Sequence, residues 1–331
     1  MLYDKFKSRF ILSPMAGVNN IAFREMCAKY HDGINFTEMV SSTALYYKSD
    51  KTEKIFEKGD LEEKVGVQIF GSNPEHLVHA GEIISNLDYV EILDVNMGCP
   101  ASKIIKNGDG SALTLDLNKV DEITYKLRSV IKKPLSVKIR IGYYEDKINC
   151  YDVIKVLERN EIDFITIHGR YAKQMYKGNA NWDIIKEANE LVETPIIANG
   201  DIFNYDDGFK ILEHTGCRFG AVARGAHGRP WIFEDLNDYL DSKIKGIEYI
   251  PKVRTHEFII ENLIEHYNKA LKYEDERVAV FEMRKQIGWY VKGLYGSTEL
   301  KSEVFKMTDP DKILNLLEEY KNIAWLHWQE N

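Results

Sequence analysis

The sequence predicts a (β/α)8 barrel followed by an all-helical C-terminal domain. Eight short runs rich in Val, Ile, Leu and Phe recur over the first two thirds of the chain, and segments with a helical pattern separate them. Nearly continuous apolar runs are typical of strands buried on both faces of a parallel sheet. Nearly every run also ends in a polar or reactive residue, as expected where barrel strands converge on one mouth. A doubly wound open sheet is the alternative fold.

The predicted strands and helices alternate along the barrel region. The strands cover residues 10–15, 34–38, 65–70, 90–96, 135–140, 164–168, 195–199 and 220–223. The clearest intervening helices cover residues 72–84, 118–131, 183–192 and 205–212. The first of these helices begins at Ser72-Asn73-Pro74-Glu75, where a capping side chain precedes a proline in the first turn.

The C-terminal part of the chain has a different pattern. Composition changes over residues 242–249, and only helical patterns follow Pro251. Residues 253–273 and 275–292 form two long mixed-charge segments, and Thr308-Asp309-Pro310-Asp311 predicts a capping box for a last helix. We therefore expect a barrel domain over residues 1–240 and a helical domain over residues 250–331.

Composition narrows the class of protein. Apolar residues make up 44% and charged residues 29% of the 331-residue chain, which is ordinary for a soluble globular protein. The four cysteines form neither a CxxC pair nor a zinc-binding spacing, so we expect a reducing compartment and no metal. Residues 1–5 are charged and unlike a signal peptide, and no apolar run is long enough to span a bilayer. A cytoplasmic protein with no membrane contact is expected, and its net charge of −8 requires any nucleic-acid contact to use a local basic patch.

The most informative segment is Leu-Asp-Val-Asn-Met-Gly-Cys-Pro, which ends at Pro100. An apolar strand ends at Asn96, the chain turns at Gly98, and Pro100 disfavours helical backbone geometry at Cys99. The Cys99 thiol is therefore expected on a fixed loop at a strand end, where α/β enzymes carry their chemistry. Cys27, Cys150 and Cys217, in contrast, are expected to be small buried apolar residues.

Two glycine-containing turns follow the seventh and eighth predicted strands, at residues 199–201 and 223–225. Backbone N–H groups at these two places, with a helix start behind them, form the usual phosphate site of such barrels. Arg224 adds a guanidinium group suited to a phosphate. The first strand lacks a GxGxxG pattern, which counts against a tightly bound dinucleotide. The turns indicate a phosphorylated cofactor, with ordinary βα turns as the alternative.

These segments resemble the flavin-dependent tRNA-dihydrouridine synthases, and the B-type bacterial branch in particular. The matching segments occur in order and at the expected spacing: residues 13–17, 94–103, 110–112, 137–142, 166–170, 198–201 and 228–233, with 283–290 in the helical domain. The sequence departs from the family pattern at Ala223, where many members have Gly, and at Gln286, where relatives often have His.

The resemblance implies FMN in the barrel mouth, NADPH as external reductant, and a uridine of structured RNA, most often tRNA, as substrate. It implies that the isoalloxazine is lined by Pro14, Met15 and Ala16. Its polar edge would be bound by Gln68 and Lys138, and His168 would face the uracil or the cofactor beside it. The ribityl chain and phosphate would be held by Asn199, Gly200, Asp201, Ala223 and Arg224.

The implied reaction is reduction of uracil to 5,6-dihydrouracil. Hydride from the reduced flavin adds at C6, charge builds on the C4 carbonyl oxygen, and C5 receives a proton from the opposite face. Hydrogen-bond donors for that charge would be Asn96, Lys138, Arg140 and His168. Cys99 would donate the proton, since free thiols titrate near ~8.5 and are mostly protonated at neutral pH.

Basic residues interleaved with aromatic ones are candidates for RNA binding. One set, Arg170, Lys173 and Lys177, follows the sixth strand, and the resemblance places Asn96, Arg140 and Arg170 near the uracil or the cofactor. Another set, Arg277, Arg284 and Lys285, has near-heptad spacing along one helix. Each set is alternatively a solvated surface. Ribosomal RNA is an alternative substrate for the same reaction. A less favoured alternative function is that of a small-molecule dihydroorotate or dihydropyrimidine dehydrogenase. A third is that of an RNA-binding module without redox activity.

Overall fold

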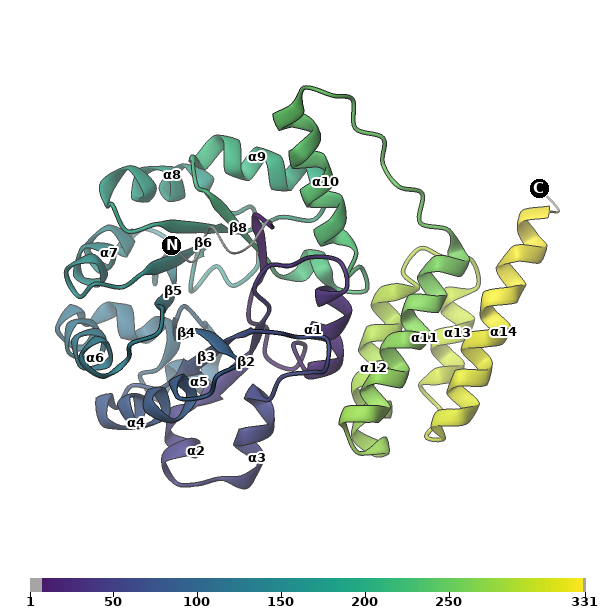
Figure 1. Ribbon diagram of the computed structural model, residues 1–331, viewed down its shortest axis with the longest axis horizontal. Helices are drawn as coiled ribbons and strands as arrows, with labels where there is room; N and C mark the ends of the chain where they lie inside the picture. The colour runs from purple at the N-terminus through teal and green to yellow at the C-terminus, as the bar shows by residue number, and fades with distance from the viewer. Residues whose placement is uncertain (1–7, 330–331) are drawn as a thin grey trace.

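The computed structural model describes residues 8–329, in which eight parallel strands curl into a barrel (Figure 1). The sheet order is β1-β8-β7-β6-β5-β4-β3-β2, and an isolated parallel bridge between Leu12 and Asn35 joins its two edges. The predicted (β/α)8 barrel is therefore confirmed, and the open-sheet alternative is wrong. The expectation about residues 1–5 lies outside the described residues.

The strands lie close to the predicted positions. They are β1 (Phe10–Leu12), β2 (Phe36–Ser41), β3 (Val65–Phe70), β4 (Val90–Met97), β5 (Leu135–Gly142), β6 (Phe164–Tyr171), β7 (Ile196–Asn199) and β8 (Phe219–Val222). The longer β5 and β6 extend two or three residues past their predicted ends. The first strand is shorter than predicted, because the chain leaves the sheet before Pro14.

Helices surround the barrel, and several short ones fill the loops. The barrel helices are α1 (Ile21–Ala28), α2 (Ser42–Tyr46), α3 (Asp50–Glu53), α4 (Pro74–Ser85), α5 (Ser102–Ile105), α6 (Leu117–Val130), α7 (Cys150–Arg159), α8 (Trp182–Leu191), α9 (Tyr205–Thr215) and α10 (Ile232–Lys245). Short 3-10 turns lie at Lys54–Phe56, Gly110–Leu115 and Arg224–Ala226. As predicted, α4 begins after Asn73, whose side chain accepts hydrogen bonds from two backbone N–H groups of the first turn.

Residues 246–255 contain neither helix nor strand and lead to a group of helices beside the barrel (Figure 1). These are α11 (His256–Tyr273), α12 (Glu276–Tyr290), α13 (Ser297–Val304) and α14 (Pro310–Gln329), so the predicted helical C-terminal region is confirmed. The helix α13 was not predicted. The division at residues 240–250 remains a prediction, although α10 ends and α11 begins on either side of it.

The predicted capping box at Thr308 takes a different form. The side chain of Asp309 accepts hydrogen bonds from the backbone N–H groups of Asp311 and Lys312, at 3.0 and 3.2 Å. Asp309 therefore caps α14 in place of Thr308, because its carboxylate reaches the unpaired N–H groups of the first turn.

The barrel and the helical group have separate hydrophobic cores that meet at α1. The barrel core packs one face of the strands, represented by the alternate positions Val65, Val67 and Ile69, against helix residues such as Leu77 and Ile84. The helical core gathers side chains of α11, α12 and α14 and also includes Ala22 of α1. Helix α1 packs directly against α11. Within the described part of the chain, no helix is both long and apolar enough to cross a membrane.

Candidate active site

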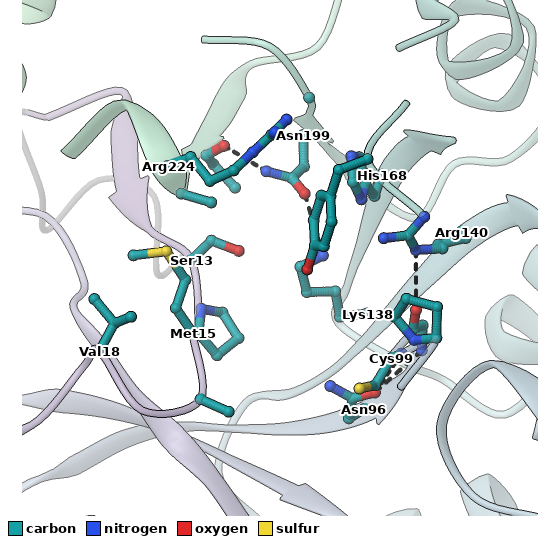
Figure 2. A pocket seen from close by; sticks show the side chains of 18 of the residues that line it. Ser13, Met15, Val18, Asn96, Cys99, Lys138, Arg140, His168, Asn199 and Arg224 are labelled. Carbon is teal, nitrogen blue, oxygen red and sulfur yellow. Dashed lines mark hydrogen bonds between the residues drawn. The ribbon is translucent and has the colours of Figure 1, made fainter. Parts of the chain in front are cut away.

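A cavity of about 460 Å³ opens at the carboxyl ends of the barrel strands (Figure 2). Its volume lies within the range of pockets that bind cofactors and small substrates. Every residue assigned from the sequence to catalysis or cofactor binding lines this cavity: Pro14, Met15, Ala16, Gln68, Asn96, Cys99, Lys138, Arg140, His168, Asn199, Gly200, Asp201, Ala223 and Arg224. Their chemical roles remain predictions, but the structure brings all of them to one place.

The loop that carries Cys99 is anchored from two strands. The side-chain oxygen of Asn96 accepts hydrogen bonds from the backbone N–H groups of Cys99, at 2.9 Å, and Gly98, at 3.2 Å. From the neighbouring β5, Arg140 Nε donates to the carbonyl of Gly98 at 3.1 Å. Gly110 closes over the loop with φ +60°, and a Cβ there would lie 2.7 Å from the Cys99 carbonyl oxygen. Cys99 is therefore held at a fixed position on the cavity wall.

The four cysteines separate as predicted. Cys99 is partly exposed in the cavity, whereas Cys27, Cys150 and Cys217 are buried. Burial raises the pKa of Cys150 to about 12 and that of Cys217 to about 11. The three buried thiols are thus protonated residues of the core.

Lys138 places a cation on the cavity wall. Its Nζ donates to Asn199 Oδ1 at 3.1 Å, and Asn199 Nδ2 in turn donates to the Ala221 carbonyl at 2.7 Å. Burial, reinforced by the positive charge of Arg140, lowers the pKa of Lys138 to about 8. The ammonium group remains mostly protonated at neutral pH and faces a site that favours a negative charge.

His168 is a neutral hydrogen-bond donor. Burial and the positive charges of Lys138, Arg140 and Arg170 lower the pKa of His168 well below its usual value. Its Nε2 lies 3.3 Å from an Arg170 guanidinium nitrogen, which can only donate, so Nε2 accepts. The ring proton is therefore on Nδ1.

Arg170 is buried among protein groups, not turned towards a substrate. Its side chain is 2% exposed and donates to Asp201 Oδ2 at 2.7 Å and to the carbonyls of Lys177 and Gly178. These bonds give the Arg170 guanidinium a structural role, and its contact with RNA stays a prediction.

Asp201 lines the cavity and is also bonded to protein groups. Its carboxylate accepts from Arg170, from the Ala180 N–H at 2.7 Å and from Arg224 at 3.3 Å. Asp201 therefore orients the Arg224 guanidinium, and its contact with the ribityl chain and phosphate stays a prediction. The preceding Gly200 has φ +138°, and a Cβ there would lie 2.6 Å from the Ala180 side chain, so only glycine fits this turn.

Three aromatic residues that line the cavity, Tyr176, Phe203 and His227, were not among the predicted site residues. Tyr176 is 52% exposed, and its ring centre lies 4.9 Å from the Arg224 guanidinium carbon and 5.5 Å from that of Arg140. The ring of His227 stacks on Trp289 of α12 with centres 3.9 Å apart and planes at 10°. The sequence indicated Tyr176 only as one of the aromatic residues interleaved with the basic residues at 170–177. No local signal indicates His227, because its position depends on a helix far along the chain.

Figure 2 shows Met15 and Val18 on one side of the cavity, with Lys138, Arg140 and His168 across from them. The first side is supported by α12. Lys285 donates to the carbonyl of Gly17, in the loop that follows Met15. Lys285 thus bonds to the barrel, whereas the sequence assigned it to RNA.

Of the other basic residues predicted to bind RNA, one is bonded within the protein and three are exposed. Arg284 donates to the Met307 carbonyl at 2.9 Å and packs its guanidinium against Phe281, so it joins segments within the helical region. Lys173, Lys177 and Arg277 are exposed. Gln286 is 1% exposed and therefore presents no group to a ligand at the surface. Among residues 8–329, no cluster of three or more His, Cys, Asp or Glu side chains could hold a metal ion.

Comparison with known proteins shows which family the sequence matches. Residues 11–324 match the family model described as dihydrouridine synthase (Dus). The chain is 32% identical to a probable tRNA-dihydrouridine synthase of Rickettsia bellii, over 96% of this chain and 95% of that protein. It is 30% identical to tRNA-dihydrouridine synthase B of Pasteurella multocida, over 99% and 97%. It is 33% identical to tRNA-dihydrouridine synthase B of Pseudomonas aeruginosa, over 92% and 90%.

The fold is also similar to a solved structure of histamine dehydrogenase from Rhizobium sp. 4-9. The TM-score is 0.51 at 11% sequence identity, over 80% of this chain and 49% of that one. At this identity the similarity concerns the barrel fold alone.

Proposed function

The chain belongs to the dihydrouridine synthase family, and on that premise we propose that it reduces the C5=C6 bond of specific uridines in tRNA to 5,6-dihydrouridine. One observation carries the proposal. A single cavity combines a partly exposed, anchored thiol, a ring of cationic and neutral donors, and the two glycine-containing turns after β7 and β8. These are the groups needed to give a proton, to stabilise a developing negative charge and to hold a phosphate.

The residues present fit FMN. The cavity has the volume of a cofactor pocket, and the tight Gly200 turn lies beside Arg224. His227 also lines it and has a buried Nε2 without a hydrogen-bond partner, as expected where a ligand would supply an acceptor. Pro14, Met15 and Ala16 would flank the isoalloxazine, with Gln68 and Lys138 at its polar edge and Asn199, Gly200, Ala223 and Arg224 at the ribityl phosphate. When bound, the flavin supplies the hydride that adds to uracil C6, and NADPH is the proposed reductant.

The side chains of this protein would do the remaining chemistry. Cys99 would give its proton to uracil C5 from the wall of the cavity. Asn96 uses its side-chain oxygen to hold the Cys99 loop and one amide hydrogen to bond Gln68 Oε1 at 2.8 Å. Its second amide hydrogen, which faces Met39 Sδ at 3.8 Å, is the one that would turn to a uracil carbonyl. Lys138 as an ammonium and His168 through Nδ1–H would stabilise negative charge on that carbonyl.

RNA binding would rely on the exposed basic residues near the mouth and on the helical region. Lys173 and Lys177 flank Tyr176, which offers an exposed ring for stacking against a base turned out of the RNA. These cations would act locally against the net charge of −8.

The decisive experiment maps dihydrouridine, position by position, in tRNA and rRNA from cells with and without this gene. We expect one or a few tRNA positions to lose the modification and to regain it with purified protein, FMN and NADPH. Loss confined to rRNA would assign the alternative substrate. Unchanged RNA together with turnover of free dihydroorotate would overturn the proposal.

A further inference from the structure

Asp94 is a buried carboxylate just beneath the cavity that the proposed chemistry does not use. It lies on β4, opposite Gln68 of β3 and Ser136 of β5 in the strand register. Asp94 is 2% exposed and is not part of the cavity lining. Its Oδ2 accepts from Gln68 Nε2 at 2.6 Å, and its Oδ1 accepts from Ser136 Oγ at 2.5 Å.

A chain of hydrogen bonds leads from Asp94 to Cys99. With its Nε2 bound to Asp94, Gln68 accepts at Oε1 from Asn96 Nδ2, at 2.8 Å. Asn96 then accepts at Oδ1 from the Cys99 N–H, at 2.9 Å. In each amide, the bond to the preceding group determines which end faces the next group. This series of hydrogen bonds ends at the loop that carries the Cys99 thiol.

The direction of this chain depends on its first member. The two ends of a side-chain amide have nearly the same shape, so only hydrogen-bond partners decide which way it points. An ionised carboxylate accepts hydrogen bonds and donates none. Asp94 therefore requires Gln68 to present its NH₂, which leaves the Gln68 oxygen for Asn96 and the Asn96 oxygen for the Cys99 loop.

We propose that Asp94 is a positioning residue that fixes the orientation of the Gln68 and Asn96 amides and thereby the place of the Cys99 loop. That this loop acts on uracil rests on the proposed function, whereas the positioning itself does not. Reversal of the two amides would turn the Asn96 oxygen towards the cavity, where a uracil carbonyl requires a donor. It would also remove the acceptor for the Cys99 N–H.

A filler role for Asp94 in the barrel interior explains the observations less well. Burying a carboxylate is costly, and burial raises the pKa of Asp94 to about 6. Ile92, the preceding residue on the same face of β4, is apolar and buried. An apolar side chain at position 94 would avoid the cost of burying charge but would leave the orientation of Gln68 unspecified.

The test measures the alkylation rate of Cys99 by iodoacetamide, quantified by peptide mass spectrometry on the folded full-length protein. The other three cysteines are buried and provide internal references. We expect Asp94→Ala to raise the Cys99 rate at least fivefold, because the loop loses its fixed acceptor. Asp94→Asn should give a smaller increase than Asp94→Ala, because its amide can either accept from or donate to Gln68, and the Ser136 hydroxyl can partner either orientation. Ser136→Ala is the matched control and should stay within twofold of wild type.

A second variant tests the connection through Gln68. Gln68→Ala should reproduce the increase, and the Asp94→Ala/Gln68→Ala double variant should react no faster than either single variant. A folded Asp94→Ala protein with an unchanged Cys99 alkylation rate would overturn the proposal. It would also be overturned if the rate increase in the double variant equalled the product of the increases in the two single variants. If Asp94→Ala does not fold, an unchanged rate in Gln68→Ala overturns it. The readout needs neither flavin nor RNA, so its outcome is separate from that of the proposed function.

Discussion

Replacing Trp289 with alanine tests whether the helical region helps to form the cofactor cavity. Trp289 lies on α12, and its ring stacks on His227, which lines the cavity two residues after the turn at Gly225. The backbone of Gly228 also lies against α12, since a Cβ there would be 2.4 Å from the Trp289 carbonyl carbon. Trp289→Ala removes the ring contact and leaves this backbone contact in place.

The expected effect follows from the contact that is lost. A stacked aromatic pair contributes about 0.5–1.5 kcal/mol beyond its buried area. Without the pair, bound FMN would have to order the loop from Arg224 to Gly228 that the stack now holds. Since 1.4 kcal/mol corresponds to a tenfold change in affinity, Trp289→Ala should weaken FMN binding about two- to tenfold.

The assay is a fluorescence titration of the apoprotein with FMN at constant temperature and salt. Phe281→Ala is the matched control, because Phe281 lies on the same helix, is 64% exposed and packs against Arg284 within the helical region. We expect the control to bind FMN like wild type. A folded Trp289→Ala protein with wild-type affinity would refute the reasoning, and so would equal weakening in both variants.

Four further predictions follow from the same contacts. Cys99→Ala should retain FMN and RNA binding but lose about 10²–10⁴ in turnover, the usual contribution of a general acid, and near-wild-type turnover in single-turnover assays would remove that role. Arg24→Met should lower the free energy of unfolding by about 3–5 kcal/mol in urea, because it leaves the buried Glu62 carboxylate without its 2.9 Å ion pair; a loss below 1 kcal/mol would contradict this. Burial lowers the pKa of His266 to about 3, so its contribution to the free energy of unfolding is present above pH 6.5 and is lost as the pH falls. At pH 5 the loss from this residue is about 2 kcal/mol. Urea unfolding at pH 7 and pH 5 should show that His266→Phe abolishes this part of the pH dependence. Lys173→Glu should weaken RNA binding and reduce its salt dependence, measured by filter binding at several salt concentrations, and an unchanged salt slope would argue against this contact.

The strands could be predicted because consecutive apolar residues indicate a strand that is buried on both faces. The bounds of β3 agree with the prediction at both ends. β5 and β6 were predicted too short because they continue through Arg140 and Arg170, whose charges would ordinarily indicate a strand end. In the folded chain these guanidinium groups are buried against carbonyl and carboxylate oxygens of neighbouring loops, and those partners are not visible in the local sequence.

The same distinction separates the site residues that could be predicted from those that could not. Cys99 was identified because its own neighbours, Gly98 and Pro100, fix the loop that carries it. Arg170 and Lys285 were assigned to RNA because the sequence shows a positive charge but not the Asp201 carboxylate or the Gly17 carbonyl that accepts from it. A cation already bonded to a protein acceptor gains less from a phosphate, since it must first give up that bond. The exposed cations at the rim of the mouth therefore carry the RNA hypothesis, and the buried ones shape the cavity beneath them.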